Sequence, residues 1–382
     1  MADDRGAALS VRLAQPGPIP LDAAFDCAPG ELLALVGPSG SGKTTVLRSI
    51  AGLYRPPEGR VACGNEIWFD AGTRICRTPQ RRSVGLVFQN YALFPHLSAL
   101  ANVAAALGHR APGDRNARAR ELLELVHLGG LEARLPSALS GGQQQRVAVA
   151  RALARDPQVL LMDEPFSAVD RVTRQKLYRE LAELRRALKM PLVLVTHDLD
   201  EAASLADRMC ILYRGRTLQI GSPDEIMSRP DNALIARLVD LRNVFEGKVL
   251  SHEGERGRTL LQWQGHTLEL SYTPQYAVGS PVCWAIPAAS VVLHRLDRPS
   301  RNAPQNALDG IVANCVSLGQ STSLDLQVDG AAGKSLYLSI PTHLARRNGI
   351  AIGQRARVSL LVEGIHLMPW EDLREHPTAV AA

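Results

Sequence analysis

The segment Gly37-Pro38-Ser39-Gly40-Ser41-Gly42-Lys43-Thr44 decides the fold of this 382-residue chain, because it fits the pattern G-x-x-x-x-G-K-[ST] at each fixed position. Residues 31–36 before it form an apolar run typical of a strand, and residues 45–53 after it have a helical pattern. In a strand–loop–helix unit of this kind, backbone N–H groups can surround a phosphate, and the helix dipole attracts its charge. We therefore expect a nucleoside triphosphate to bind at this loop.

Lys43 and Thr44 have distinct expected roles in this loop. Lys43 should reach the β- and γ-phosphates, and the Thr44 hydroxyl should bind Mg²⁺. The residues of the loop expected to contact ATP are Gly37, Pro38, Ser39, Gly40, Ser41, Gly42, Lys43, Thr44 and Thr45.

Two consecutive carboxylates follow the apolar run at residues 159–162. Asp163 is expected to hold Mg²⁺ through water, and Glu164 to accept the proton of the attacking water. A strand that simply ends in a polar loop has the same local pattern. The phosphate loop upstream favours the catalytic interpretation.

The segment Leu139-Ser-Gly-Gly-Gln-Gln-Gln-Arg146 resembles the signature motif of ATP-binding cassette (ABC) transporter ATPases. The resemblance implies that Ser140, Gly141, Gly142 and Gln143 contact ATP bound to a partner copy. Ser140 is also a suitable N-cap for a helix over residues 141–154, whatever its role in binding.

Three further positions are similar to motifs of the same family. Gln89 resembles the Q-loop glutamine, which implies contacts with ATP and the metal ion. Asp170, at the end of Ser167-Ala-Val-Asp170, resembles the D-loop aspartate, and His197 resembles the catalytic switch histidine. The resemblance covers residues 9–231 and implies catalysis by Glu164 and His197, with Mg²⁺ held at Thr44, Gln89 and Asp163.

The resemblance also implies partners. One phosphate loop and one signature motif per chain imply a homodimer with two composite ATP sites. Integral membrane permease subunits would dock near residues 90–96, and a periplasmic or surface solute-binding protein would act only indirectly. One departure concerns adenine: residues 11–20 contain no aromatic side chain to stack on the base, and the nearest, Phe25, is expected in a buried strand.

Two domains are expected. Residues 1–240 alternate strand and helix patterns, with predicted strands at 31–36, 83–88, 159–162 and 192–196, which indicates an α/β phosphate-loop NTPase core with a helical subdomain inserted at about 90–155. Residues 241–382 show short Val/Leu alternations broken by Gly and Pro, which indicates a β-rich, OB-like barrel accessory domain similar to the TOBE and Mop types. The helical pattern 224–241 joins the two.

Two stretches of the accessory domain are alike. Asn243-Val-Phe-Glu-Gly-Lys-Val249 and Asn306-Ala-Leu-Asp-Gly-Ile-Val312 are offset by 63 residues, that is 306 − 243. They indicate two similar halves, 241–300 and 301–372. The alternative is a chance likeness of two turns that each enter a strand.

The accessory domain resembles those of bacterial importer ATPases, and with the insertion at residues 68–82 this resemblance implies an importer for an inorganic oxyanion, with molybdate preferred. The alternatives are an iron, sulfate or polyamine importer. One feature departs from the molybdate pattern: Ala303-Pro-Gln-Asn306 lacks the hydroxyl and guanidinium groups that would suit an oxyanion, whereas Arg242-Asn243 retains a guanidinium.

Composition narrows the class of protein. The net charge of +5 on 382 residues is too weak and evenly spread to indicate nucleic-acid binding, and only 4% of residues are aromatic, so stacking platforms for bases are few. A soluble ABC ATPase acting on nucleic acid or ribosomes is therefore the disfavoured alternative. Six cysteines without metal-binding spacing suggest reduced thiols. We expect a peripheral protein at the cytoplasmic face of the inner membrane.

Overall fold

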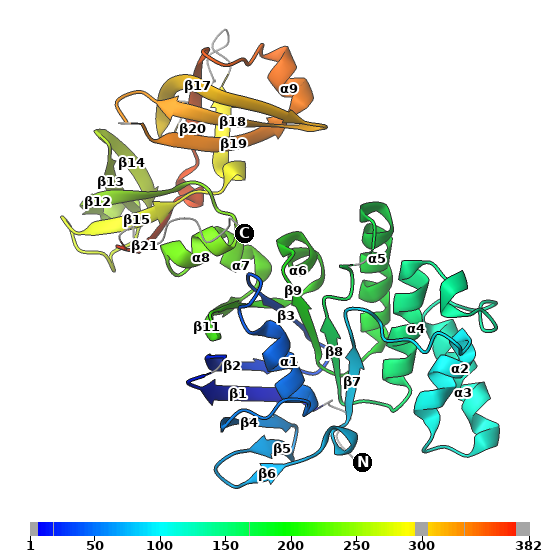
Figure 1. Ribbon diagram of the computed structural model, residues 1–382. Helices are drawn as coiled ribbons and strands as arrows, with labels where there is room; N and C mark the ends of the chain where they lie inside the picture. Colours follow the sequence, from blue (N-terminus) through cyan, green and yellow to red (C-terminus); the bar gives the residue numbers. More distant parts are fainter. Residues whose placement is uncertain (1–6, 18, 168, 295–304, 332, 372–382) are drawn as a thin grey trace. The chain divides into compact units, whose positions relative to one another are not determined.

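A computed structural model describes residues 7–17, 19–167, 169–294, 305–331 and 333–371 (Figure 1). The chain forms two compact units, 1–223 and 224–382, which are described separately. This division falls before the predicted boundary near residue 240, because α8 (Ala233–Leu238) contacts β12 (Val244–Glu253) of the second unit. The predicted helical stretch 224–241 is two helices, α7 (Pro223–Ser228) and α8, separated at Pro230, which cannot continue a helix.

The first unit is built on one mixed sheet. Within the described residues its strand order is β6-β5-β4-β1-β2-β11-β10-β3-β9-β8-β7. The strands are β1 (Leu9–Gln15), β2 (Leu21–Cys27), β3 (Leu32–Val36), β4 (Glu58–Cys63), β5 (Glu66–Asp70), β6 (Ile75–Cys76), β7 (Val84–Val87), β8 (Val159–Asp163), β9 (Leu192–Thr196), β10 (Arg208–Tyr213) and β11 (Arg216–Gly221). Neighbouring strands from β10 to β7 are parallel, as the α/β pattern predicts. The four predicted strands are β3, β7, β8 and β9.

The parallel strands are apolar on both faces because helices cover both. All five residues of β3 are buried, and they alternate between two cores. Leu33 and Leu35 belong to the same core as Val46 of α1 (Lys43–Ala51), whereas Leu32 belongs to the core on the other face, which includes Leu205. The carboxyl ends of β3, β7, β8 and β9 therefore meet at one edge of the sheet, which is where the predicted motifs begin.

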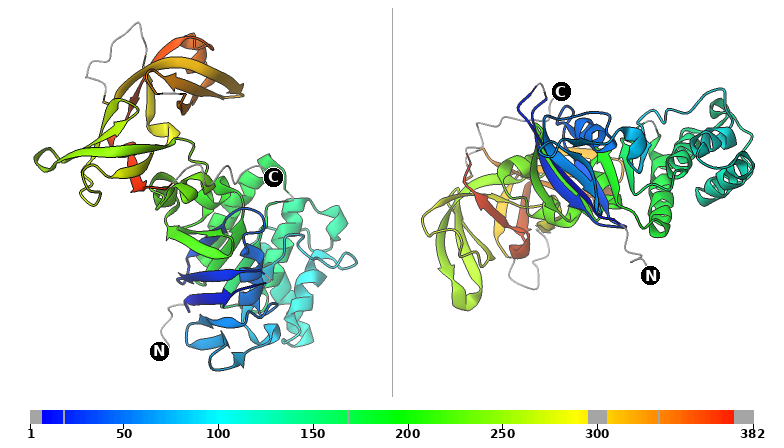
Figure 2. Two further views of the ribbon diagram at one scale, coloured as in Figure 1. Left: turned by 60° about the vertical axis from the view of Figure 1, so that its left-hand side comes forward. Right: turned by 90° about the horizontal axis from the view of Figure 1, so that it is seen from below.

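The predicted helical subdomain lies beside β7. It contains α2 (Ala99–Ala104), α3 (Pro112–Leu125) and α4 (Gly141–Leu153). Both views of Figure 2 show these helices and the antiparallel strands β1, β2 and β4 on opposite sides of the first unit. The remaining helices of this unit, α5 (Arg171–Ala187) and α6 (Leu199–Leu205), precede β9 and β10.

The predicted insertion at residues 68–82 ends in a buried guanidinium that anchors α1. Nη1 of Arg82 donates to the carbonyl oxygens of Ser49 and Ile50, both at 2.7 Å, in the last turn of α1. These carbonyls lie in the last turn, where acceptors are only partly satisfied: the Ser49 carbonyl also accepts from the Gly52 N–H at 3.2 Å. A cation there complements the negative pole of the helix dipole. Arg82 thereby fixes the helix whose opposite end forms part of the phosphate loop.

The second unit contains two five-stranded antiparallel sheets that share one core. Their orders are β14-β13-β12-β15-β21 and β16-β20-β17-β18-β19. The elements after β12 are β13 (Arg258–Trp263), β14 (His266–Ser271), β15 (Pro281–Ala285), β16 (Val291–His294), β17 (Ala307–Leu318), β18 (Ser321–Val328), β19 (Ser335–Pro341), α9 (Thr342–Arg347), β20 (Arg355–Leu360) and β21 (His366–Pro369). The two predicted halves therefore exchange their last strands: β16 pairs with β20, and β21 pairs with β15.

The repeated asparagines hold these two halves together. Asn243 exchanges two hydrogen bonds of 2.7 Å with the backbone N–H and C=O of Tyr337 in β19. Asn306 makes the same pair with the backbone of Glu269 in β14, at 2.6 and 2.7 Å. Each side-chain amide pairs with the edge of a strand in the other half, as the backbone of a neighbouring strand would. The two stretches that are 63 residues apart in sequence therefore make the same kind of structural contact.

These contacts bear on the proposed oxyanion surface. Asn243 is only 1% exposed, and the Arg242 guanidinium lies over the Tyr337 ring, 4.4 Å from its centroid, and 3.5 Å from Asp240. Arg242 and Asn243 are therefore engaged within the fold. Ala303 and Pro304 of the other segment lie outside the described residues.

All six cysteines are free thiols, as expected.

In the described part of the chain, no helix combines the length and apolarity needed to cross a membrane.

The asparagine contact yields a stability prediction. Asn243→Ala leaves the N–H and C=O of Tyr337 without these partners at a partly buried contact, which should lower the free energy of unfolding by about 1–3 kcal/mol. Asn314→Ala, at an exposed position of β17, is the control and should change it by less than about 0.5 kcal/mol. Urea unfolding followed by tryptophan fluorescence measures both. Equal effects of the two substitutions would contradict the structural role of Asn243.

Candidate active site

The phosphate loop links β3 to α1, and its backbone requires glycine at two points. A Cβ on Gly37 would lie 2.0 Å from the carbonyl oxygen of Leu212, so the loop passes directly against β10. Gly42 is the N-cap of α1 with φ of 97°, a conformation that side chains disfavour. The loop therefore ends on the free N–H groups of a helix N-terminus, as predicted for phosphate binding.

Lys43 folds back across this loop. Its Nζ donates to the carbonyl oxygens of Gly37 at 2.7 Å and Pro38 at 2.9 Å. Burial lowers the pKa of Lys43, and the nearby carboxylates of Glu164 and Asp163 oppose that shift. The ammonium is thus held inside the ring of the loop, where a phosphate oxygen could replace the carbonyls as its partner.

Thr44 and Asp163 meet although they are far apart in the sequence. The Thr44 hydroxyl donates to Oδ1 of Asp163 at 3.2 Å, at the carboxyl end of β8. Burial raises the pKa of Asp163, whereas the Thr44 hydrogen bond lowers it. A hydroxyl and a carboxylate are hard oxygen ligands of the kind Mg²⁺ prefers, so the residues present fit such an ion.

Glu164 lies at the centre of the site. Its Oε2 accepts a hydrogen bond from Nε2 of Gln89 at 3.1 Å, and its Oε1 is 3.2 Å from Nδ1 of His197. Three residues from the ends of β7, β8 and β9 are thereby joined through one carboxylate. The sequence predicted each residue singly, and the structure brings them together.

The backbone of Glu164 is strained. Its φ is +44°, and its N–H donates to the carbonyl oxygen of Val195 at 2.9 Å. Such a conformation in a residue other than glycine costs on the order of 1–3 kcal/mol and is typical of functional positions. The strain aims the carboxylate between Gln89 and His197 rather than along β8.

Two further residues lie beside this site: Arg48, which was missed from the sequence, and Ser167, which was noted only as the start of the D-loop segment. Arg48 and Ser167 line one cavity together with Gln89 and Asp163. Arg48 lowers the pKa of Asp163 by its charge, and Ser167 donates from its hydroxyl to the backbone carbonyl of Glu164 at 2.9 Å. Arg48 could have been found, because it lies four residues after Thr44 and so on the same helix face.

The signature residues begin α4 in the helical subdomain. Ser140 and Gln143 form a capping box, so the N-cap interpretation is confirmed. Gly142 is packed against α5: a Cβ there would lie 3.2 Å from Cδ1 of Leu177. The elements with which α4 packs include α2, α3, α5 and β7, whereas those of α1 include β8 and β9. Within one chain, the helix that begins with the signature residues therefore packs against other elements than the helix that follows the phosphate loop.

Asp170 accepts a hydrogen bond from the backbone N–H of Thr173 at 3.1 Å and so caps the first turn of α5. Phe25 is 4% exposed in β2 and belongs to the core, as expected, so it offers no face to adenine.

A groove lies near the end of β7 and includes Ala92 and Phe94 of the stretch 90–96 that was predicted to dock a permease. Phe88 and Phe94 are 38% and 46% exposed, and the Arg151 guanidinium lies 5.7 Å from the centroid of the Phe94 ring. Arg151 also donates to the carbonyl oxygens of Tyr91 and Ala92, at 2.8 and 2.7 Å. The groove therefore has an exposed aromatic rim on a backbone fixed by an arginine.

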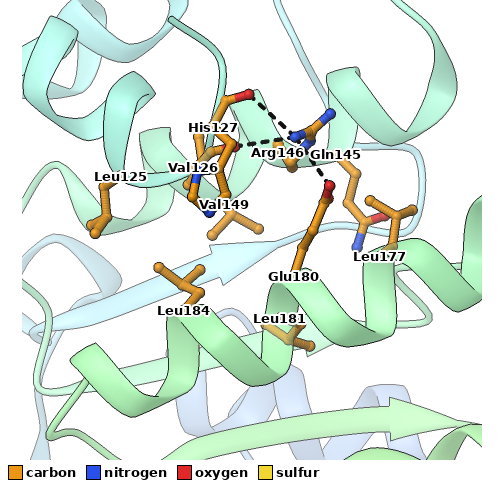
Figure 3. Close-up of a pocket in the computed structure, with 10 residues that line it drawn as sticks. All are labelled: Leu125, Val126, His127, Gln145, Arg146, Val149, Leu177, Glu180, Leu181 and Leu184. Atoms are coloured by element: carbon orange, nitrogen blue, oxygen red, sulfur yellow. Dashed lines mark hydrogen bonds and ion pairs between the residues drawn. The ribbon is translucent and has the colours of Figure 1, made fainter.

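A second pocket marks the joint between the helical subdomain and α5 (Figure 3). Arg146 of α4 contacts the carbonyl oxygen of His127 at 3.3 Å and Oε1 of Glu180 of α5 at 3.5 Å. Leu177, Leu181 and Leu184 of α5 form the opposite apolar wall. The signature helix is thus fastened to α5 by an ion pair as well as by apolar packing.

Comparison with known proteins places this site in a family. Residues 21–167 match the family model described as ABC transporter. A sulfate/thiosulfate import ATP-binding protein of Xanthomonas campestris is 42% identical over 353 residues, which are 90% of this chain and 94% of that protein. A spermidine/putrescine import ATP-binding protein of Oleidesulfovibrio alaskensis is 38% identical over 315 residues, 81% of this chain and 82% of that protein.

Other relatives match over less of their length. A sulfate/thiosulfate import ATP-binding protein of Caulobacter vibrioides is 48% identical over 231 residues, 59% of this chain and 66% of that protein. Several such relatives are matched over 57–66% of their own length, less than two thirds. Because the matches with the Xanthomonas and Oleidesulfovibrio proteins nonetheless extend over most of both chains, the chain belongs to the ABC transporter family of ATP-binding proteins.

Proposed function

We propose that this chain is the ATP-hydrolysing subunit of an ABC importer. The observation that carries the proposal is the Glu164 carboxylate, held between Gln89 and His197 at the edge of the sheet where the phosphate loop also ends. Hydrolysis of a phosphoanhydride needs little more than positioning, charge stabilisation and an oriented water. The residues at this edge are suited to all three.

Each residue has a defined part in this mechanism. The loop amides and Lys43 hold the phosphates, and Thr44 and Asp163, with Gln89, would hold Mg²⁺. When bound, Mg²⁺ neutralises the charge that develops on the phosphates. Glu164 accepts the proton of the attacking water, and His197, 3.2 Å away, orients the carboxylate and contacts the terminal phosphate.

A second copy of the chain completes the site. The signature residues Ser140 to Gln143 form a helix N-terminus. Within the same chain, their helix α4 packs against other elements than α1, the helix of the phosphate loop. In a twofold-symmetric dimer, the signature surface of each copy would cover the ATP held by the other. Two identical composite sites follow from the twofold arrangement.

Permease subunits are the proposed membrane partners, docked at the groove with Phe88 and Phe94. A solute-binding protein would act through the permease, without touching this chain. The relatives that carry names of importers support this role over one in nucleic-acid or ribosome processing. We place the chain on the cytoplasmic side of the membrane, where ATP is available.

The proposed solute is sulfate or thiosulfate, with a polyamine as the second candidate. Molybdate was preferred from the sequence, but the relatives named above are sulfate/thiosulfate and spermidine/putrescine import proteins. Arg242 and Asn243, the segment that retained a guanidinium, are engaged in contacts within the accessory unit. Iron remains an alternative without a relative among these three.

The catalytic assignment predicts the behaviour of Glu164→Gln. This variant should bind ATP but hydrolyse it about 10²–10⁴-fold more slowly, because the general base is lost. Phosphate release and titration with a fluorescent nucleotide measure the two properties. Lys43→Ala should instead lose tight ATP binding.

Glu124→Gln is the matched control, because Glu124 is an exposed carboxylate on α3. Its phosphate release should equal that of the wild type. Hydrolysis at the normal rate by Glu164→Gln would rule out Glu164 as the base.

The solute assignment predicts uptake. Cells of the source organism that lack the chain should lose uptake of labelled sulfate, and the wild-type chain but not Glu164→Gln should restore it. Spermidine and molybdate uptake are measured alongside. Intact sulfate uptake together with a loss of spermidine or molybdate uptake would contradict the assignment.

A further inference from the structure

A cluster of charged side chains lies behind the active site, and no step of the proposed mechanism uses it. Its members are Arg174 at the start of α5, and Asp198 and Glu201 at the start of α6. These two helix starts follow the loops that carry Asp170 and His197. The cluster therefore lies between two motifs that must act together.

Arg174 connects the two loops directly. Its Nη1 is 3.2 Å from Oδ2 of Asp198, and its Nη2 donates to the carbonyl oxygen of Val169 at 3.1 Å. Its backbone N–H donates to the carbonyl oxygen of Asp170 at 2.9 Å. Both partners in the ion pair are about 30% exposed, at 29% and 31%, so water screens the pair only in part.

Asp198 transmits this contact to the residue that precedes His197. Its carboxylate accepts from the backbone N–H of Glu201 at 3.0 Å, as an N-cap. Its own backbone N–H donates to the Thr196 hydroxyl oxygen at 3.0 Å. The backbone on both sides of His197 is thus fixed by side chains.

Glu201 completes the cluster from the core. It is 4% exposed, and its Oε2 accepts a hydrogen bond from the Thr196 hydroxyl at 3.0 Å. Its Oε1 has no hydrogen-bond partner among the described residues. Burial raises the pKa of Glu201 to about 8; the charges of Asp198 and Glu164 add to this shift, and Thr196 and Arg174 oppose it. The carboxyl group is therefore largely neutral near pH 7.

We propose that Arg174, Asp198 and Glu201 act as positioning residues that hold the His197 loop against the Asp170 loop. His197 is then placed correctly only while these two loops stay in contact. The inference rests on the proposed ATPase function and extends it to residues outside the motifs.

The same helix also touches the signature region. Gly142 packs on Leu177, and Arg146 pairs with Glu180, one and two turns beyond Arg174. If α4 moves when its signature residues contact ATP bound to the partner copy, α5 would move with it. The ion pair of Arg174 with Asp198 would then shift the His197 loop. This gives each composite site a physical link to the other, in the form of one rigid helix with an ion pair near its start.

A double-mutant cycle tests the link in the full chain. Arg174→Gln and Asp198→Asn should each lower kcat by about tenfold, and the double variant should be no slower than Arg174→Gln alone, because both substitutions break the same ion pair. KM for ATP should stay within about twofold, because the phosphate loop is intact. Arg174→Lys should restore part of kcat. Arg179→Gln, at an exposed position of α5, is the control and should match the wild type.

The outcomes separate this inference from the proposed function. Unchanged kcat in the single variants, additive losses in the double variant, or losses that merely follow the melting temperature would overturn the positioning role. Absence of ATP hydrolysis by the wild-type chain would instead refute the proposed function.

A pH series of Glu201→Gln tests the third member. The carboxyl group has a pKa of about 8 in the fold against an ordinary value of 4.5. The folded state thus binds a proton that the unfolded state has released, and wild-type stability falls as pH rises from 4.5 to 8. The glutamine variant lacks this loss. Its melting temperature should match the wild type near pH 5 and exceed it increasingly up to pH 8. Parallel curves would exclude a buried neutral acid from the cluster.

Discussion

The contact on which the active site depends is the one that Glu164 makes at the end of β8. Its N–H joins Val195 of the neighbouring strand, while its carboxylate contacts both Gln89 and His197. These contacts require the left-handed backbone of Glu164. The parallel register of β7, β8 and β9 is what brings the three side chains to a single edge. A shift of one strand would separate the base from the histidine.

The same principle of small, long-range polar contacts organises the rest of the chain. Arg82 fixes the far end of the phosphate-binding helix through backbone carbonyls. In the second unit, the side-chain amides of Asn243 and Asn306 each pair with the backbone of a strand in the opposite half. All three are nearly fully buried or bonded to backbone, so their role is to define geometry rather than to contact ligands.

Much of this could be predicted from the sequence. The motifs lie where local patterns indicated, because a phosphate loop, a strand end and a helix cap are each determined by residues close in sequence. Partners distant in sequence could not be predicted. The pair Asp198 and Glu201 has the spacing of a capping box, yet Glu201 turns away to Thr196, 3.0 Å distant, because the core lies on that side. The strand exchange between β16 and β21 was missed for a similar reason, since strand patterns do not specify the partner strand.

In the proposed dimer, each ATP site is made from two copies of the chain. The most direct measurement mixes two inactive variants, Lys43→Ala and Ser140→Arg, and follows phosphate release. A mixed dimer has one site with an intact phosphate loop and an intact signature from opposite chains, so activity should recover to about a quarter of the wild-type value if the chains assort at random. A mixture that is no more active than either variant alone would contradict a site shared between two chains.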